Sequence, residues 1–160
     1  MAFTLTSNDF QDGQALPQAQ VFAGMGQSGG NQSPHLAWSG EPAGTRSFVV
    51  TCFDLDAPTG SGWWHWVVAN LPATVRELPR DAGSGKGLPT GAVQCRTDFG
   101  KPGYGGAAPP PGPAHRYQFT VHALKVERID VDGEASGAMV GFHVHFNSLG
   151  SARITATYGS

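Results

Sequence analysis

The stretch that decides the fold is Tyr104-Gly-Gly-Ala-Ala-Pro-Pro-Pro-Gly-Pro-Ala-His-Arg-Tyr117, a loop of glycine and proline that runs into a strand. Glycine lets the backbone approach a bound group closely, and proline keeps a loop stiff. From residue 115 to residue 124 apolar and polar side chains alternate, which is typical of a half-buried strand. Its apolar side begins with His115 and Tyr117, two groups that can hydrogen-bond. We interpret this end of the strand as one wall of a small polar pocket.

Two further segments have the pattern of central strands. Residues 46–54, Arg-Ser-Phe-Val-Val-Thr-Cys-Phe-Asp, are apolar on both faces, so we expect this strand to be covered on each side. It ends in Asp54-Leu-Asp-Ala-Pro58, which brings two carboxylates to the rim of the sheet. Residues 63–70, Trp-Trp-His-Trp-Val-Val-Ala-Asn, form the second strand, and strict alternation places Trp64 and Trp66 on the side opposite His65. Taken alone, His65 fits a hydrogen-bonded core histidine better than a site residue.

The remaining elements are predicted to be short. Strands are expected near residues 3–6, 20–23, 35–38, 92–97 and 151–158, and a turn-rich surface loop over residues 71–91. One helix is expected over about 135–147, because Met139, Phe142, His143 and Phe146 share one apolar stripe that should face the core. His143 and His145 point about 200° apart on such a helix and cannot bind one metal ion.

Composition favours an all-β protein with a single domain over residues 1–160. Glycine (23) and proline (12) are frequent, yet 39% of the residues are hydrophobic, which argues for many turns rather than disorder. The net charge is −2 and the basic residues are scattered, so nucleic-acid binding is not expected.

The segment 1–9 has neither the basic leader nor the apolar core of a signal peptide, and no apolar run approaches the roughly 20 residues that span a bilayer. We therefore expect a protein of the cytoplasm without a transmembrane segment. Cys52 and Cys95 are expected to be free thiols, and Cys52 should be a small buried residue of its strand.

Polar groups thus stand at three strand ends: Asp54 and Asp56, His65, and His115 with Tyr117. If these strands are neighbours, two imidazoles, a phenol and glycine amides would surround a small anion. Asp54 would repel phosphate, but it can hold a histidine protonated and oriented, or accept from the ammonium of an ethanolamine group.

At these residues the chain resembles the phosphatidylethanolamine-binding protein family, in particular its short bacterial branch similar to Raf kinase inhibitor. The motifs that carry the resemblance span nearly the whole chain: Asn31-Gln-Ser-Pro-His-Leu-Ala-Trp38, Asp54-Leu-Asp-Ala-Pro58, Gly62-Trp-Trp-His-Trp66, Tyr104-Gly-Gly, and His115-Arg-Tyr117. The resemblance implies a β-sandwich-like fold with a large central sheet, a smaller sheet and one or two short helices.

The resemblance also implies a pocket for phosphate head groups and other small anions. Its positions fall on Asp54, Ala57, Pro58, His65, Gly106, Ala108, Pro110, His115 and Tyr117. A non-enzymatic binding protein is therefore expected, with no cofactor and no metal. The bacterial relatives suggest a homodimer, and a kinase-like partner recognised through the pocket is a further expectation.

Three alternatives stay open. A hydrolase of small phosphate or carboxylate esters would use His65 or His115 as general base with Asp54 orienting it, although no activated nucleophile is evident. Residues 109–113, Pro-Pro-Pro-Gly-Pro, would serve an interaction protein as a polyproline ligand. Finally, His65, His115 and Asp54 would make a partial metal site if they are neighbours.

Overall fold

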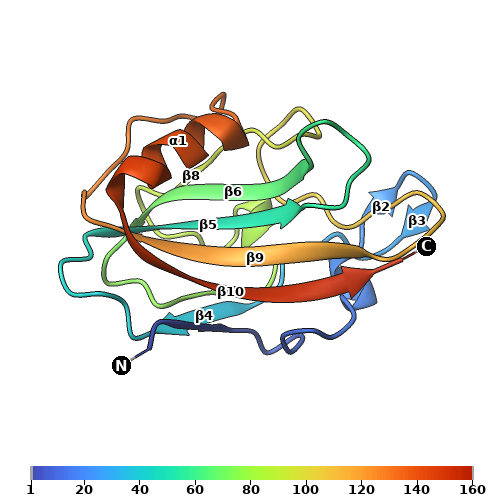
Figure 1. The fold of residues 1–160 in the computed structure, drawn as a ribbon, viewed down its shortest axis with the longest axis horizontal. Helices are drawn as coiled ribbons and strands as arrows, with labels where there is room; N and C mark the ends of the chain where they lie inside the picture. Colours follow the sequence, from blue (N-terminus) through green and yellow to red (C-terminus); the bar gives the residue numbers. More distant parts are fainter. Residues whose placement is uncertain (1, 160) are drawn as a thin grey trace.

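A five-stranded antiparallel sheet forms the centre of the structure, a computed structural model that describes residues 2–159 (Figure 1). The strands lie in the order β10-β9-β5-β6-β8. Their bounds are Ser47–Asp54 for β5, Trp63–Pro72 for β6, Val93–Gln94 for β8, His115–Leu124 for β9 and Ser148–Tyr158 for β10. The predicted central strand is confirmed, because every residue of β5 except Phe53 is buried.

Two apolar layers cover the two faces of this sheet. A smaller sheet packs on one face and consists of β1 (Thr4–Thr6), β4 (Leu36–Ser39) and β7 (Glu77–Leu78). Helix α1 (Gly137–Asn147) packs on the other face, where Val140 and Val144 join Val49 and Val67. The fold is therefore mainly β, with a large central sheet, smaller sheets and one α-helix among the described residues, as expected.

The short elements differ most from the sequence-based expectation. Residues 20–23 do not form one strand, because a 3-10 turn (Gln18–Gln20) precedes a hairpin of β2 (Ala23–Gly24) and β3 (Gln27–Ser28). The strand predicted over 92–97 has only the two residues of β8. The loop over 71–91 contains β7 and a second 3-10 turn, Ala82–Ser84. Within the described part of the chain, no helix has the length and hydrophobicity that crossing a bilayer requires.

The predicted orientation of the helix was wrong. Met139, Phe142 and Phe146 do not face the core, since 49%, 61% and 61% of their surfaces are exposed. The buried side contains Gly137, Val140 and Val144 instead. Both sides of this helix are apolar, so periodicity could not select one. Gly137 decides the matter, because a Cβ at that position would lie 2.4 Å from the Trp64 ring, and only glycine allows this close contact.

The predicted alternation along β6 was also wrong, because β6 contains a β-bulge at His65. Cys52 is opposite Trp66, but the next residue, Phe53, is opposite Trp64, so His65 has no partner across the β5–β6 pair. After this extra residue the side chains change faces: Trp66 belongs to the core under the small sheet, whereas Trp64 packs on the side of α1. The bulge therefore turns His65 to the side where Trp66 also points.

Both cysteines are free and buried, as expected. They lie in the two separate apolar layers, Cys52 under the small sheet and Cys95 under the helix. Burial, and secondarily the charge of Asp54, raises the pKa of Cys52 well above its ordinary value. This thiol is therefore in its neutral form at neutral pH.

Candidate functional site

Strand direction explains why the polar strand ends meet. β5 runs antiparallel to both of its neighbours, β6 and β9, so the last residue of β5 lies beside the first residues of the other two. Asp54 is paired with Trp63 of β6 on one side and with Tyr117 of β9 on the other. The β2–β3 hairpin lies at this same end of the sheet (Figure 1). Residues that are far apart in sequence thus come together at one edge.

A cavity of about 180 Å³ opens at this edge. Eight of the nine predicted positions line it: Asp54, Ala57, Pro58, His65, Ala108, Pro110, His115 and Tyr117. The ninth, Gly106, is not among the lining residues. A Cβ there would lie 2.3 Å from the backbone oxygen of Gln20, and its amide donates to Asn31 Oδ1 at 2.8 Å. Gly106 is therefore needed for close packing between two loops behind the pocket wall.

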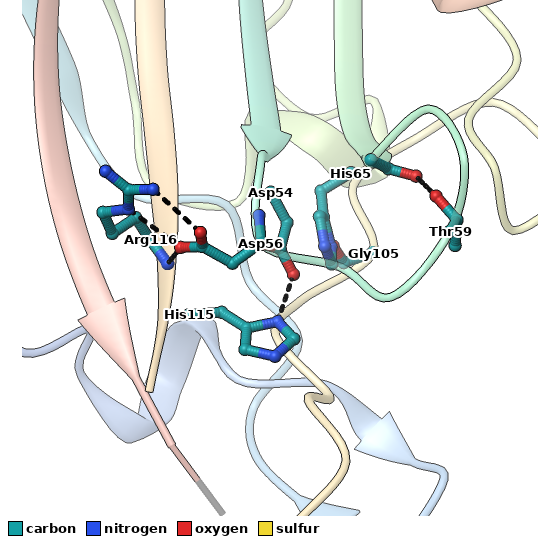
Figure 2. A network of polar contacts seen from close by, with 8 residues as sticks. Asp54, Asp56, Thr59, His65, Gly105, His115 and Arg116 are labelled. Carbon is teal, nitrogen blue, oxygen red and sulfur yellow. Dashed lines mark hydrogen bonds and ion pairs between the residues drawn. The ribbon is translucent and has the colours of Figure 1, made fainter. Parts of the chain in front are cut away.

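His115 is held by Asp54. Its Nδ1 lies 2.7 Å from Asp54 Oδ2, and because a carboxylate only accepts, Nδ1–H is the donor (Figure 2). The other carboxylate oxygen of Asp54 accepts from the amide of Asp56 at 2.9 Å. Only 10% of the His115 side chain and 5% of the Asp54 side chain is exposed. The pair therefore fixes the orientation of the imidazole and leaves Nε2 without a bond to the described residues.

The second carboxylate of the motif has a different partner. Asp56 accepts from Nε, Nη2 and the backbone amide of Arg116 at 2.8–2.9 Å, and Figure 2 shows it directed away from His115. The hydrogen bonds from Arg116 lower the pKa of Asp56 to about 2. Asp56 therefore anchors the loop after β5 to β9 and does not line the pocket.

His65 is held by the glycine loop. Its Nδ1 lies 2.7 Å from the carbonyl oxygen of Gly105, so Nδ1 carries the proton, and the Gly105 amide donates back to the His65 carbonyl at 2.9 Å. The residue is only 4% exposed, and burial lowers its pKa. At neutral pH His65 is therefore a neutral imidazole whose Nε2 can only accept a hydrogen bond.

Two buried donors at the pocket lack a protein partner of good geometry. Within residues 2–159, Trp63 Nε1 has no hydrogen-bond partner, and Tyr117 Oη has none of good geometry, although a weaker hydrogen bond to Asp54 contributes to its raised pKa. Both atoms are buried and both residues line the pocket. Burial, followed by the charge of Asp54, raises the pKa of Tyr117 well above its usual range, so the phenol keeps its proton. Buried polar groups are almost always paired, and unpaired donors at a cavity indicate a place for an acceptor.

Sequence reasoning missed five residues that line the pocket: Met25, Thr59, Trp63, Phe99 and Pro109. Trp63 was available from the sequence, since it stands two positions before His65 on the same side of the strand. Phe99 gave no such signal. It reaches the pocket because Asp98 pairs with the backbone of Trp64, accepting at 2.7 Å and donating at 3.1 Å. Met25 reaches the pocket only because the β2–β3 hairpin, which contains it, lies at this end of the sheet.

A metal centre is not supported by the side chains that meet here. In the part of the chain that the structure describes, no group of three or more histidine, cysteine, aspartate or glutamate side chains is arranged to hold a metal ion. The two imidazoles and Asp54 share the pocket, but Asp54 is already bound to His115.

These features define a class of mainly β proteins in which the ends of adjacent central strands carry two oriented imidazoles around a small cavity. The chain belongs to the phosphatidylethanolamine-binding protein family, whose sequence pattern matches residues 6–159.

Two relatives come from Escherichia coli K12. The chain is 68% identical to the UPF0098 protein YbhB over 155 residues, which cover 96% of this chain and 98% of that protein. It is 57% identical to the UPF0098 protein YbcL over 160 residues, covering 98% and 87%. The crystal structure of YbcL, described as a member of the mammalian PEBP family, superposes with a TM-score of 0.97 at 55% identity and covers 100% of this chain and 99% of that one. A putative PEBP homologue from Chlamydia trachomatis has a TM-score of 0.83 at 28% identity, covering 99% and 98%.

Proposed function

We propose that this protein binds a small anion of the phosphate type in the pocket at the ends of β5, β6 and β9, without transforming it. The observation that carries the proposal is the pair of buried donors, Trp63 Nε1 and Tyr117 Oη, which have no partner of good geometry in the described protein. The oxygen atoms of a phosphate group would accept from both. His65 and His115 stand at the same cavity, each with one ring nitrogen already bonded and Nε2 available.

The arrangement favours a singly charged ligand. The neutral His65 Nε2 accepts a hydrogen bond, and a singly protonated phosphate ester supplies the matching P–O–H donor. Asp54 also disfavours a second negative charge, because like charges repel strongly in a poorly hydrated site. The affinity should therefore fall, by up to tenfold per pH unit, as pH rises above about 6, the second pKa of a phosphate monoester.

The same pocket is proposed to bind a protein partner through a phosphate group. A phosphorylated side chain presents the same chemical group as a free phosphate ester, so a phosphoprotein or a kinase substrate is a candidate ligand. Kinase modulation and the homodimer stay predictions that rest on the resemblance, and the cytoplasmic location stays a prediction that rests on the sequence of residues 1–9 and the lack of a long apolar run.

The alternative functions have less support. A hydrolase would use the Asp54–His115 pair as an acid–base dyad, but Cys52 is buried as a thiol and the Thr59 hydroxyl donates to the Gly62 carbonyl at 2.6 Å. A polyproline ligand must present its prolines to a partner; Pro110, Pro111 and Pro113 are exposed, but Pro109 is buried and lines the pocket together with Pro110.

Calorimetric titration with methyl phosphate tests the proposal. Tyr117→Phe should weaken binding roughly two- to tenfold, the worth of one neutral hydrogen bond, without lowering the melting temperature. Tyr158→Phe is the matched control, because the Tyr158 hydroxyl bonds Gln27 at 3.3 Å and does not line the pocket. No measurable binding to the unmodified protein, or equal affinity in Tyr117→Phe, would contradict the proposed function.

A further inference from the structure

The walls of the pocket are mainly apolar above its polar base. Around Asp54, His65, His115, Tyr117 and Thr59, the other lining residues are Met25, Ala57, Pro58, Trp63, Phe99, Ala108, Pro109 and Pro110. The cavity of about 180 Å³ is larger than the roughly 30 Å³ that one water occupies in the liquid, so it has room for a substituent on the anionic group. That substituent would lie against the apolar walls.

The carboxylate of Asp54 at the pocket already accepts a hydrogen bond on each of its oxygens. Asp54 is the one acidic residue that lines the pocket within residues 2–159, and its two oxygens accept from Asp56 N and His115 Nδ1. The side chain of Asp54 is only 5% exposed. Asp56 is bound to Arg116 and lies outside the lining. An ammonium group would therefore have to share Asp54 with two existing donors, at a side chain that is almost fully buried.

The aromatic rings do not form a cage for a cation either. Phe99 is stacked on Phe22, with ring centroids 4.8 Å apart and an angle of 14° between the planes. Tyr117 is stacked on His115 at 6.5 Å and meets His65 edge-on at 5.2 Å. Trp63 in turn meets Phe99 edge-on at 5.4 Å, so these contacts engage the rings with one another and leave fewer ring faces for an ammonium group. A charge buried without a partner is strongly disfavoured.

We propose that the pocket selects a small anion with an apolar substituent, such as an alkyl phosphate, over a zwitterionic head group such as phosphoethanolamine. This inference rests on the proposed function, because it assumes that the anionic group occupies the base of the pocket. It adds the class of ligand. One negative group lies next to His65 and His115, and it carries a short hydrocarbon group that lies against Met25 and the other apolar lining residues.

Titration with three esters tests the selectivity. Propyl phosphate and phosphoethanolamine have the same number of heavy atoms, and they differ in a terminal methyl group against an ammonium group. Each buried methylene is worth about fourfold in affinity, so propyl phosphate, with two more methylenes, should bind roughly 15-fold more tightly than methyl phosphate. Phosphoethanolamine should bind no more tightly than methyl phosphate. Phosphocholine, as a fourth ligand, tests for cation–π binding and should also show no gain.

A matched pair of variants locates the hydrocarbon group. Met25→Gln places a polar amide at the pocket mouth, where Met25 is 68% exposed, and should reduce the preference for propyl over methyl phosphate. Met139→Gln makes the same change on the exposed side of α1, away from the pocket, and should leave that preference as it is.

The outcomes separate the two proposals. If no ester binds, the proposed function fails and this inference fails with it. If methyl phosphate binds but propyl phosphate gives no gain, or if either cationic ester binds as tightly as propyl phosphate, the inference alone is overturned. An equal loss of preference in Met25→Gln and Met139→Gln would also overturn it.

Discussion

The pocket and the outer side of α1 both combine histidine with aromatic residues, but they do so in opposite environments. In the pocket, His65 and His115 are 4% and 8% exposed, and each has one ring nitrogen hydrogen-bonded. On α1, Phe142 and Phe146 are each 61% exposed, and their rings meet edge to face at 5.1 Å. The imidazoles of His143 and His145 have no hydrogen-bond partner among the residues described.

This difference shows that residue type alone does not make a site. A hydrogen bond from Nδ1 fixes the tautomer and the direction of a buried imidazole. A solvated imidazole has neither constraint. Histidine beside aromatic residues therefore has a defined tautomer and direction in the pocket. On the helix the structure fixes neither.

Removal of one histidine from each region should give the largest contrast. His115→Ala leaves the buried Asp54 carboxylate without its strongest partner and removes one ligand contact, so the affinity for methyl phosphate should fall about 100-fold. His143→Ala should not change that affinity. Titration calorimetry measures both, and circular dichroism verifies that the variants are folded. A loss of less than about threefold in His115→Ala would show that the imidazole is not part of the site.

A third environment, partial burial outside the pocket, is found at His122. Burial, and then the charge of Arg153, lowers the pKa of His122 from 6.5 to about 4. The unfolded chain binds this proton more readily, so the free energy of unfolding should decrease by about 3 kcal/mol as pH falls from 6.5 to 4. Urea denaturation at several pH values measures the slope.

His122→Asn should reduce that slope, and His143→Asn should not. His65 also has a lowered pKa, so some of the slope should persist in His122→Asn. The measurements should stay above about pH 4.5, because Asp56, with its pKa lowered from 3.8 to about 2, loses its stabilising ion pair only below that range. If the slope measured for His122→Asn were identical to that of the unmodified protein, the assignment of the pH dependence to His122 would be contradicted.

The two sides of α1 are compared by the same substitution at two glycines. A Cβ at Gly137 would lie 2.4 Å from the Trp64 ring, so Gly137→Ala should lower the free energy of unfolding by about 1 to 2 kcal/mol. At Gly141 no atom lies within 4 Å of an added Cβ, so Gly141→Ala should raise it by about 0.5 to 1 kcal/mol. Thermal or urea denaturation measures both. Changes of the same sign in the two variants would show that the helix packs differently.

The polar residues of the site could be predicted because they stand at strand ends that the sequence marks clearly, whereas Ala57, Pro58, Ala108 and Pro110 were expected only from the family resemblance. Asp54 precedes a proline loop, and His115 and Tyr117 follow one, so their positions at the rim did not depend on distant contacts. Phe99 and Met25 could not be predicted in the same way. Phe99 depends on the bonds between Asp98 and Trp64, and Met25 on a hairpin in which each strand has only two residues.

The sequence by itself determined the long central strands and the polar groups that end them, because alternation and turn residues act over a few neighbouring positions. Tertiary structure alone decided which side of α1 is buried and where His65 points. Both depend on pairing between distant segments: Gly137 against Trp64, and the one-residue bulge of β6 against β5. A shift of one residue moves a side chain to the other face of a sheet, and local periodicity does not encode that shift.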